Sequence, residues 1–157
     1  MAEQAAAPFE VTWDAGAALL TTRVRSPITV DEVALYKEAL DGVLAAIPSG
    51  TTFAWMSSAV DYDAFSDRAA HAAMRAIVPS ALAAHGLRTS MLDLYEGADV
   101  PIARTRGVSC GAIAHVHGDA QKMEALDSRF GGPAERYFGD EKAALEWVVR
   151  ARSPEDV

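Results

Sequence analysis

The chain has 157 residues, of which 50% are hydrophobic and 23% are charged, so it fits one globular domain that needs no disulfide or metal to hold its core. Its formal net charge of -8 argues against a general affinity for nucleic acid or for an anionic membrane surface. The single cysteine excludes an intrachain disulfide, and no stretch approaches the roughly 20 apolar residues of a membrane span, so a cytoplasmic protein is expected.

The amino-terminal stretch predicts a β-hairpin. Residues 1–8 are rich in alanine and lack the basic start and apolar run of a signal peptide, and we expect them to be disordered. Apolar and polar residues then alternate on both sides of a turn signal at Asp14-Ala15-Gly16. This pattern is typical of two antiparallel strands, over residues 9–13 and 17–25.

The clearest boundary follows the hairpin. Thr29 and Glu32 have the spacing of a capping box, in which each side chain accepts a hydrogen bond from a free backbone N–H group at the start of a helix. Apolar residues then recur at helical spacing. We therefore predict a helix over residues 30–46, ended by Pro48.

The middle of the chain alternates between strand and helix patterns. Residues 51–60 are apolar on both faces, which indicates an interior strand. A helical stretch capped by Asp63 or Ser66 then runs to Gly86. Within it, Pro79 either kinks the helix or starts another one at its first turn.

The next segment contains the strand that we expect at the centre of the sheet. Residues 89–95 indicate a fourth strand, and residues 96–106 form a loop long enough to suggest a function. Small and β-branched residues at positions 110–116 then indicate a buried strand in the middle of the sheet. It leads directly into a helix capped by Asp119.

A short strand over residues 134–138 and a helix capped by Asp140 complete the pattern. The order β-β-α-β-α-β-β-α-β-α predicts a single α/β domain over residues 9–150, with residues 151–157 as a tail. Its sheet is mixed, with flanking helices and an N-terminal β-hairpin.

Four segments give the chain a resemblance to the SpoIIAA-like family, which has a STAS-like fold. They are the hairpin with the helix entry Pro27-Ile28-Thr29-Val30-Asp31-Glu32, the third strand out to Asp61, the stretch from Ala112 to Gly118-Asp119, and the stretch from Glu135 to Asp140 followed by residues 143–148. The phosphorylated serine of anti-sigma antagonists in this family lies in an Asp-Ser-Ser/Thr-Gly sequence. Neither Ser57-Ser58-Ala59 nor Ser66-Asp67 matches it. The resemblance therefore implies the fold and a regulatory or binding role, without the phosphoserine switch.

Two histidines stand at the end of the central strand. His115 and His117 are two residues apart, so their side chains share a face at the carboxyl end, where open α/β sheets place their sites. With Asp93 or Asp119 they would offer three ligands to a metal ion. The usual ligand spacings are absent, so we predict no metal and no cofactor.

The other candidates precede this strand. Arg104 and Arg106 suit a carboxylate or phosphate group, with solvated loop charge as the alternative. Cys110 is interpreted as a packed core residue rather than a nucleophile. The predicted binding site consists of Asp93, Tyr95, Arg104, Arg106, His115 and His117.

Binding without catalysis is the first function that the sequence suggests, with a protein partner or a small anionic or lipidic ligand. The alternative is a small enzyme or an anion- or lipid-binding protein that uses a pocket around His115 and His117. A third hypothesis is that the protein is a dimer-forming accessory domain without a ligand. The exposed edges of such a sheet favour a homodimer.

Overall fold

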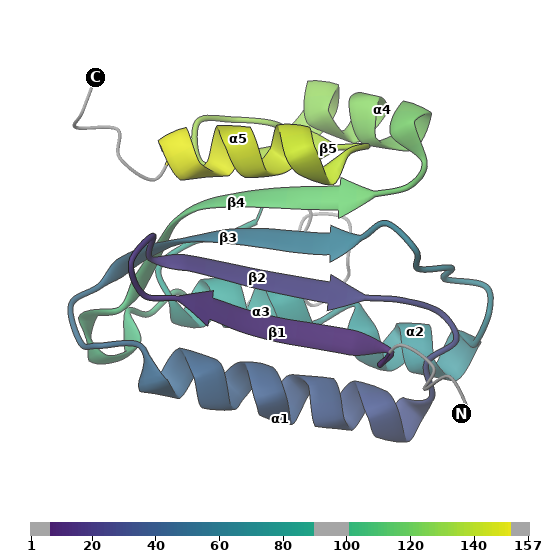
Figure 1. Ribbon diagram of the computed structural model, residues 1–157, viewed down its shortest axis with the longest axis horizontal. Coiled ribbons are helices and arrows are strands. Elements are labelled where there is room, and N and C mark those ends of the chain that lie inside the picture. Colours follow the sequence, from purple (N-terminus) through teal and green to yellow (C-terminus); the bar gives the residue numbers. More distant parts are fainter. Residues whose placement is uncertain (1–6, 90–100, 152–157) are drawn as a thin grey trace, which may run out of the picture.

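Five strands form one mixed sheet in the computed structural model, which describes residues 7–89 and 101–151 (Figure 1). The strands lie side by side in chain order: β1 Phe9–Asp14, β2 Leu19–Val24, β3 Thr52–Ala59, β4 Ser109–His117 and β5 Glu135–Phe138. β1 pairs with β2 antiparallel, and the other neighbouring pairs are parallel. The predicted mixed sheet with an N-terminal hairpin is therefore confirmed.

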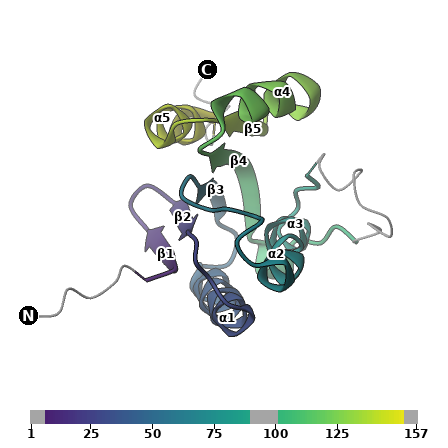
Figure 2. The same ribbon diagram turned by 90° about the vertical axis from the view of Figure 1, so that its right-hand side faces the viewer.

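The helices cover both faces of this sheet. Their bounds are α1 Val30–Ala46, α2 Arg68–Met74, α3 Ile77–Ala84, α4 Ala120–Phe130 and α5 Glu141–Ala151, with a 3₁₀ turn at Thr105–Gly107. Figure 2 shows α1, α2 and α3 on one side of the sheet and α5 on the other, while α4 lies beside β5. None of the helices in the described ranges is long and apolar enough to cross a membrane.

Side-chain alternation in β3 and β4 separates two hydrophobic clusters. Trp55 and Ile113 are Cα partners and belong to the larger cluster, which contains residues of α1, α2 and α3. Ala112 and Ala114 face the opposite way and pack with Val148 of α5. Small side chains on this second face allow α5 to approach the sheet closely. Because helices cover both faces of β4, its sequence is apolar at successive positions instead of alternating.

The start of α1 confirms the predicted capping box. The Thr29 hydroxyl accepts a hydrogen bond from the Glu32 backbone N–H at 3.2 Å, and the Glu32 carboxylate accepts one from the Thr29 N–H at 3.0 Å. α1 ends at Ala46, two residues before Pro48, as predicted.

The predicted cap of the second helix was wrong. Asp67, rather than Asp63 or Ser66, caps α2 by accepting from the Ala70 N–H at 3.0 Å. The Asp63 carboxylate instead accepts from the Phe65 N–H at 2.9 Å, which closes a local turn. Aspartate suits either role, so composition alone did not distinguish the cap from the turn.

The helical stretch before Gly86 consists of two helices. α2 ends at Met74 and α3 begins at Ile77, which places Pro79 in the first turn of α3. A backbone N–H there has no partner within the helix, so proline costs little. Gly86 has φ +82° and follows the end of α3, as expected for a helix stop.

The histidine-ended strand lies in the interior of the sheet. β4 pairs with β3 on one side and with β5 on the other, and Ile113 is fully buried. This confirms the prediction for residues 110–116. The strand predicted over residues 89–95 lies outside the described residues except for Thr89, which has no regular structure. Residues 1–6 and 152–157 are also outside them.

Candidate functional site

The structure divides the predicted site between the two ends of β4. Arg104 and Arg106 precede the first residue of β4, whereas His115 and His117 lie at its carboxyl end. A strand of nine residues is about 26 Å long, so the arginines do not meet the histidines. Asp93 and Tyr95 lie outside the described residues.

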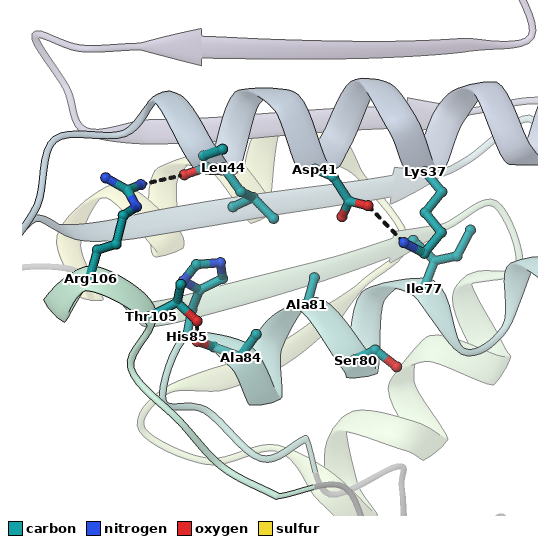
Figure 3. A pocket seen from close by; sticks show the side chains of 11 residues that line it. Lys37, Asp41, Leu44, Ile77, Ser80, Ala81, Ala84, His85, Thr105 and Arg106 are labelled. Atoms are coloured by element: carbon teal, nitrogen blue, oxygen red, sulfur yellow. Dashed lines mark hydrogen bonds and ion pairs between the residues drawn. The ribbon is translucent and has the colours of Figure 1, made fainter.

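Arg106 has a structural role at the end of α1. Its guanidinium donates to the Leu44 carbonyl at 3.0 Å and to the Ile47 carbonyl at 2.8 Å, as Figure 3 shows for Leu44. A cation at this position satisfies free carbonyl groups and the negative end of the helix dipole. Arg104 forms an isolated bridge with His85 and is exposed. Neither arginine frames an anion site with the α4 helix start.

A hollow of about 350 Å³ lies between α1 and α3 beside Arg106 (Figure 3). Polar side chains in its walls are occupied within the protein: Lys37 pairs with Asp41 at 2.7 Å, and the Thr105 hydroxyl donates to the Ala84 carbonyl at 3.0 Å. No buried side-chain nitrogen or oxygen without a partner is recorded among its described lining residues. We regard this hollow as a gap between helices.

A second cavity, of about 220 Å³, lies over the carboxyl ends of the parallel strands. We call it the carboxyl-end cavity. Its floor includes Ser57, His115 and Tyr137, which occupy matching positions on β3, β4 and β5. Residues of α2, α3 and α4 form its walls. This is the end of the sheet at which the sequence predicted the site.

His115 is held on the β5 side of the floor. Its Nε2 lies 2.7 Å from the Glu135 carboxylate, and its ring stacks on Tyr137 with centroids 4.7 Å apart. Glu135 is buried and also accepts a hydrogen bond from the Thr89 hydroxyl. Because Glu135 and Tyr137 both fix the ring, His115 is a rigid part of the cavity.

His117 and Asp119 are occupied by the start of α4. The His117 Nδ1 accepts from the Asp119 N–H at 3.1 Å, and the Asp119 carboxylate accepts from the Lys122 N–H at 3.1 Å. Asp119 is thus a helix cap, as predicted. Within residues 7–89 and 101–151, no group of three His, Cys, Asp or Glu residues could hold a metal ion.

A third histidine of this cavity was not among the residues predicted from the sequence. His71, on α2, has its Nδ1 2.9 Å from the Tyr62 hydroxyl. Burial, followed by the charges of Arg75 and Lys122, lowers the pKa of His71, and burial raises the pKa of Tyr62. His71 is therefore uncharged at neutral pH. A lone histidine in an alanine-rich helix carries no sequence signal that would distinguish it from a surface residue.

Two buried tyrosines line the same cavity. Tyr36 of α1 is fully buried and Tyr137 is 4% exposed, and both line the cavity. Neither hydroxyl has a hydrogen-bond partner of acceptable geometry in the described structure. More than about nine in ten buried polar groups in proteins have such a partner, so two exceptions in one cavity are informative.

The polar neighbours of these hydroxyls hold hydrogen bonds of their own. Thr22 lies beside Tyr36, and its hydroxyl accepts from the Trp55 Nε1 at 3.0 Å. Thr89 and Glu135 lie beside Tyr137 and bond to each other. Burial raises the pKa of Tyr36 to about 12, and burial with the Glu135 charge raises that of Tyr137. Both phenols therefore remain protonated hydrogen-bond donors.

Cys110 is a core residue, as interpreted from the sequence. It is buried, its Sγ lies 3.3 Å from the Ala112 carbonyl, and burial raises its pKa to about 12. A thiolate is the reactive form of cysteine, so this side chain is a poor nucleophile.

Cys110 should react with a disulfide reagent at pH 7.5 at least about a hundredfold more slowly in the native protein than in denaturant, because the thiol is buried and protonated. Absorbance of the released thiol measures the rate. The control is Ser128→Cys in a Cys110→Ala background, because residue 128 is exposed on α4 and should react quickly. Native Cys110 reacting as fast as this control would contradict the assignment.

The fold and the cavity define an α/β domain with a partly apolar pocket at the carboxyl ends of its parallel strands. No protein-family model, curated protein or solved structure matches the chain. The function is therefore inferred from the geometry of the cavity.

Proposed function

We propose that this protein is a SpoIIAA-like, STAS-like cytoplasmic binding domain that holds a small ligand in its carboxyl-end cavity, without catalysis and without the phosphoserine switch. The observation that carries this proposal is that Tyr36 and Tyr137 both line one cavity and that neither of their buried hydroxyls has a hydrogen-bond partner among the residues that the structure describes. An unpaired buried donor costs about 1–3 kcal/mol. A ligand with a hydrogen-bond acceptor would remove that cost.

The composition of the cavity supports a small-molecule site. Its described walls contain apolar side chains such as Met74, Val78 and Met123, and its polar groups are concentrated on the floor and at the rim. Mostly apolar walls with a few convergent polar groups are typical of small-molecule sites. The carboxyl ends of parallel strands are also the usual position for such a site.

Local features support the SpoIIAA-like part of the proposal. The Gly118-Asp119 exit leaves no space for a side chain, because a Cβ atom on Gly118 would lie 2.6 Å from the Val60 carbonyl oxygen. Ser58 donates to the Glu141 carboxylate at 2.6 Å, so its hydroxyl has a structural role. A phosphoserine switch there would break that contact. The homodimer stays a prediction.

Catalysis is the second candidate, and the Tyr62–His71 pair favours it. An uncharged imidazole with a hydrogen-bonded phenol, inside a cavity, can serve as a general base. Cys110 does not supply a nucleophile for it, because its thiol is buried and protonated. The unpaired hydroxyls of Tyr36 and Tyr137 would instead be satisfied by a bound ligand with a hydrogen-bond acceptor. We therefore prefer ligand binding to catalysis as the function.

Native mass spectrometry of the protein purified from cytoplasm should show a small-molecule adduct. Removing both hydroxyls, by Tyr36→Phe with Tyr137→Phe, should reduce the adduct by at least about tenfold, because each hydroxyl contributes roughly 1 kcal/mol or more. The same double substitution should leave the ligand-free protein at least as stable, since two unpaired donors are lost.

The matched control is Lys142→Met, an exposed change on α5 at the opposite face, which should leave the adduct unchanged. Wild-type protein that carries no adduct, with a crystal structure showing only ordered water on both phenols, would contradict the proposal. So would a double variant that retains the ligand in full.

A further inference from the structure

The two edges of the sheet differ in how their backbone groups are used. β5 forms one edge, and its own chain covers the outer side. The Asp127 carboxylate of α4 accepts from the Tyr137 N–H at 3.0 Å, and the Gly132 N–H donates to the Glu135 carbonyl at 2.7 Å. These contacts occupy backbone groups that a further strand would need.

β1 forms the other edge, and its outer side is open. The Arg25 N–H donates to the Pro8 carbonyl at 2.8 Å, so the even-numbered residues of β1 direct their backbone groups toward β2. The backbone groups of Phe9, Val11 and Trp13 consequently point outward. Within residues 7–89 and 101–151, none of these outward groups forms a hydrogen bond.

The side chains of β1 leave this edge unprotected. Phe9–Asp14 contains no lysine, proline or register shift, which are common devices that keep an edge strand from pairing with another chain. Phe9, Val11 and Trp13 face α1 but remain only half-buried. The edge therefore offers both free backbone groups and apolar side chains.

One flank of α1 continues this apolar surface. Leu35 is 54% exposed, and Ala39 and Gly42 follow it at helical spacing. Lys37 and Asp41 line the hollow on the α3 side of α1, so Leu35 lies on the far flank. Figure 2 shows α2 and α3 on one side of α1 and β1 on the other.

We propose that the protein forms a homodimer in which the β1 strands of two copies pair antiparallel, with Val11 opposite Val11 of the second copy. Phe9 of each copy then lies opposite Trp13 of the other, and the outward groups form about six hydrogen bonds. The twofold axis through Val11 turns the Leu35 flanks of both α1 helices toward each other.

Charge selects this register over its neighbours. The side chains of Glu10, Thr12 and Asp14 share the face of β1 that is turned away from α1. In the proposed register, Glu10 lies opposite Thr12 of the second copy. A shift of two residues would place Glu10 opposite either Glu10 or Asp14 of the second copy, and like charges directly opposite are destabilising.

The dimer is separate from the carboxyl-end cavity. β1 supplies none of the described lining residues of that cavity, so dimerisation does not depend on a bound ligand. Failure of the dimer would leave the proposed binding function intact, and an empty cavity would leave the dimer intact.

Sedimentation velocity of the full chain measures the association. At about 0.15 M salt, which screens the repulsion between two chains of net charge -8, we expect a species of twice the 16.7 kDa chain mass. A chain that remains a monomer at about 0.1 mM would overturn the proposal.

Val11→Pro tests whether the outer edge of β1 is the interface. The N–H that it removes faces outward, so the variant should abolish the dimer and keep the hydrogen bonds between β1 and β2. Thermal melts followed by circular dichroism check that the monomer folds. A folded Val11→Pro chain that still dimerises would contradict this interface.

Thr12→Lys and Thr12→Glu test the register without changing the backbone. Thr12→Lys should tighten the dimer by about fivefold, because the lysine faces Glu10 of the second copy, and Thr12→Glu should weaken it by a similar factor. Ser128→Lys and Ser128→Glu are the matched controls on α4, beside the covered edge, and should change neither. They make the same changes in net charge.

Weakening by both Thr12 variants would indicate a register with Thr12 opposite Thr12 of the second copy, and would overturn the one proposed. Equal effects at positions 12 and 128 would show that only net charge matters, and would overturn the β1 interface itself.

Discussion

Replacing Trp55 with alanine should lower the free energy of unfolding by about 3–5 kcal/mol, as measured by urea denaturation. Trp55 is fully buried on β3, the middle strand of the sheet, and its Nε1 donates to the Thr22 hydroxyl at 3.0 Å. The substitution removes a large side chain from the main hydrophobic cluster. It also leaves Thr22 without this donor.

Trp13→Ala is the matched control, because it makes the same chemical change on an outer strand. Trp13 lies on β1 and is only partly buried, with its ring 6.2 Å from that of Phe53. We expect a loss of about 1–2 kcal/mol, in proportion to the smaller apolar area that is buried. Equal losses for the two tryptophans would contradict the central position of β3.

Glu135→Ala should have the next largest effect, with a loss of about 3 kcal/mol in the free energy of unfolding. The carboxylate is buried between the Thr89 hydroxyl and the His115 Nε2, and both would lose this partner. The floor of the carboxyl-end cavity would also lose the group that fixes the His115 ring. Urea denaturation measures the loss.

Glu135→Gln distinguishes hydrogen bonding from charge. Its amide oxygen can still accept from Thr89, so the expected loss is about half that of Glu135→Ala. NMR signals of His115 should shift in both variants, since the ring lies against this side chain. A loss below about 1 kcal/mol in Glu135→Ala would contradict a buried pair at this position.

Local patterns accounted for most of the elements. The capping box of Thr29 and Glu32 and the alternation of residues 9–13 involve groups only a few residues apart, so their geometry follows from backbone preference and side-chain periodicity. The cap of α2 was missed because Asp63 and Asp67 are chemically identical. Only the chain path determined which of them met a helix start.

The candidate site was predicted less well. His115 does lie at the carboxyl end of an interior strand, as its place in the sequence indicated. Arg106 was grouped with it because both flank the same segment, yet Arg106 binds carbonyls at the end of α1. Closeness in the sequence did not mean closeness in space here, because the two ends of an extended strand lie far apart.

Residue patterns alone were sufficient to predict the α/β class, the hairpin, the start of α1 and the interior strand that ends in histidines. These depend on periodicity and on contacts between residues close in the chain. The meeting of Tyr36, His71 and Tyr137 at one cavity became visible only in the folded chain. They come from α1, α2 and β5, and such a meeting depends on how the helices pack on the sheet, which no local pattern records.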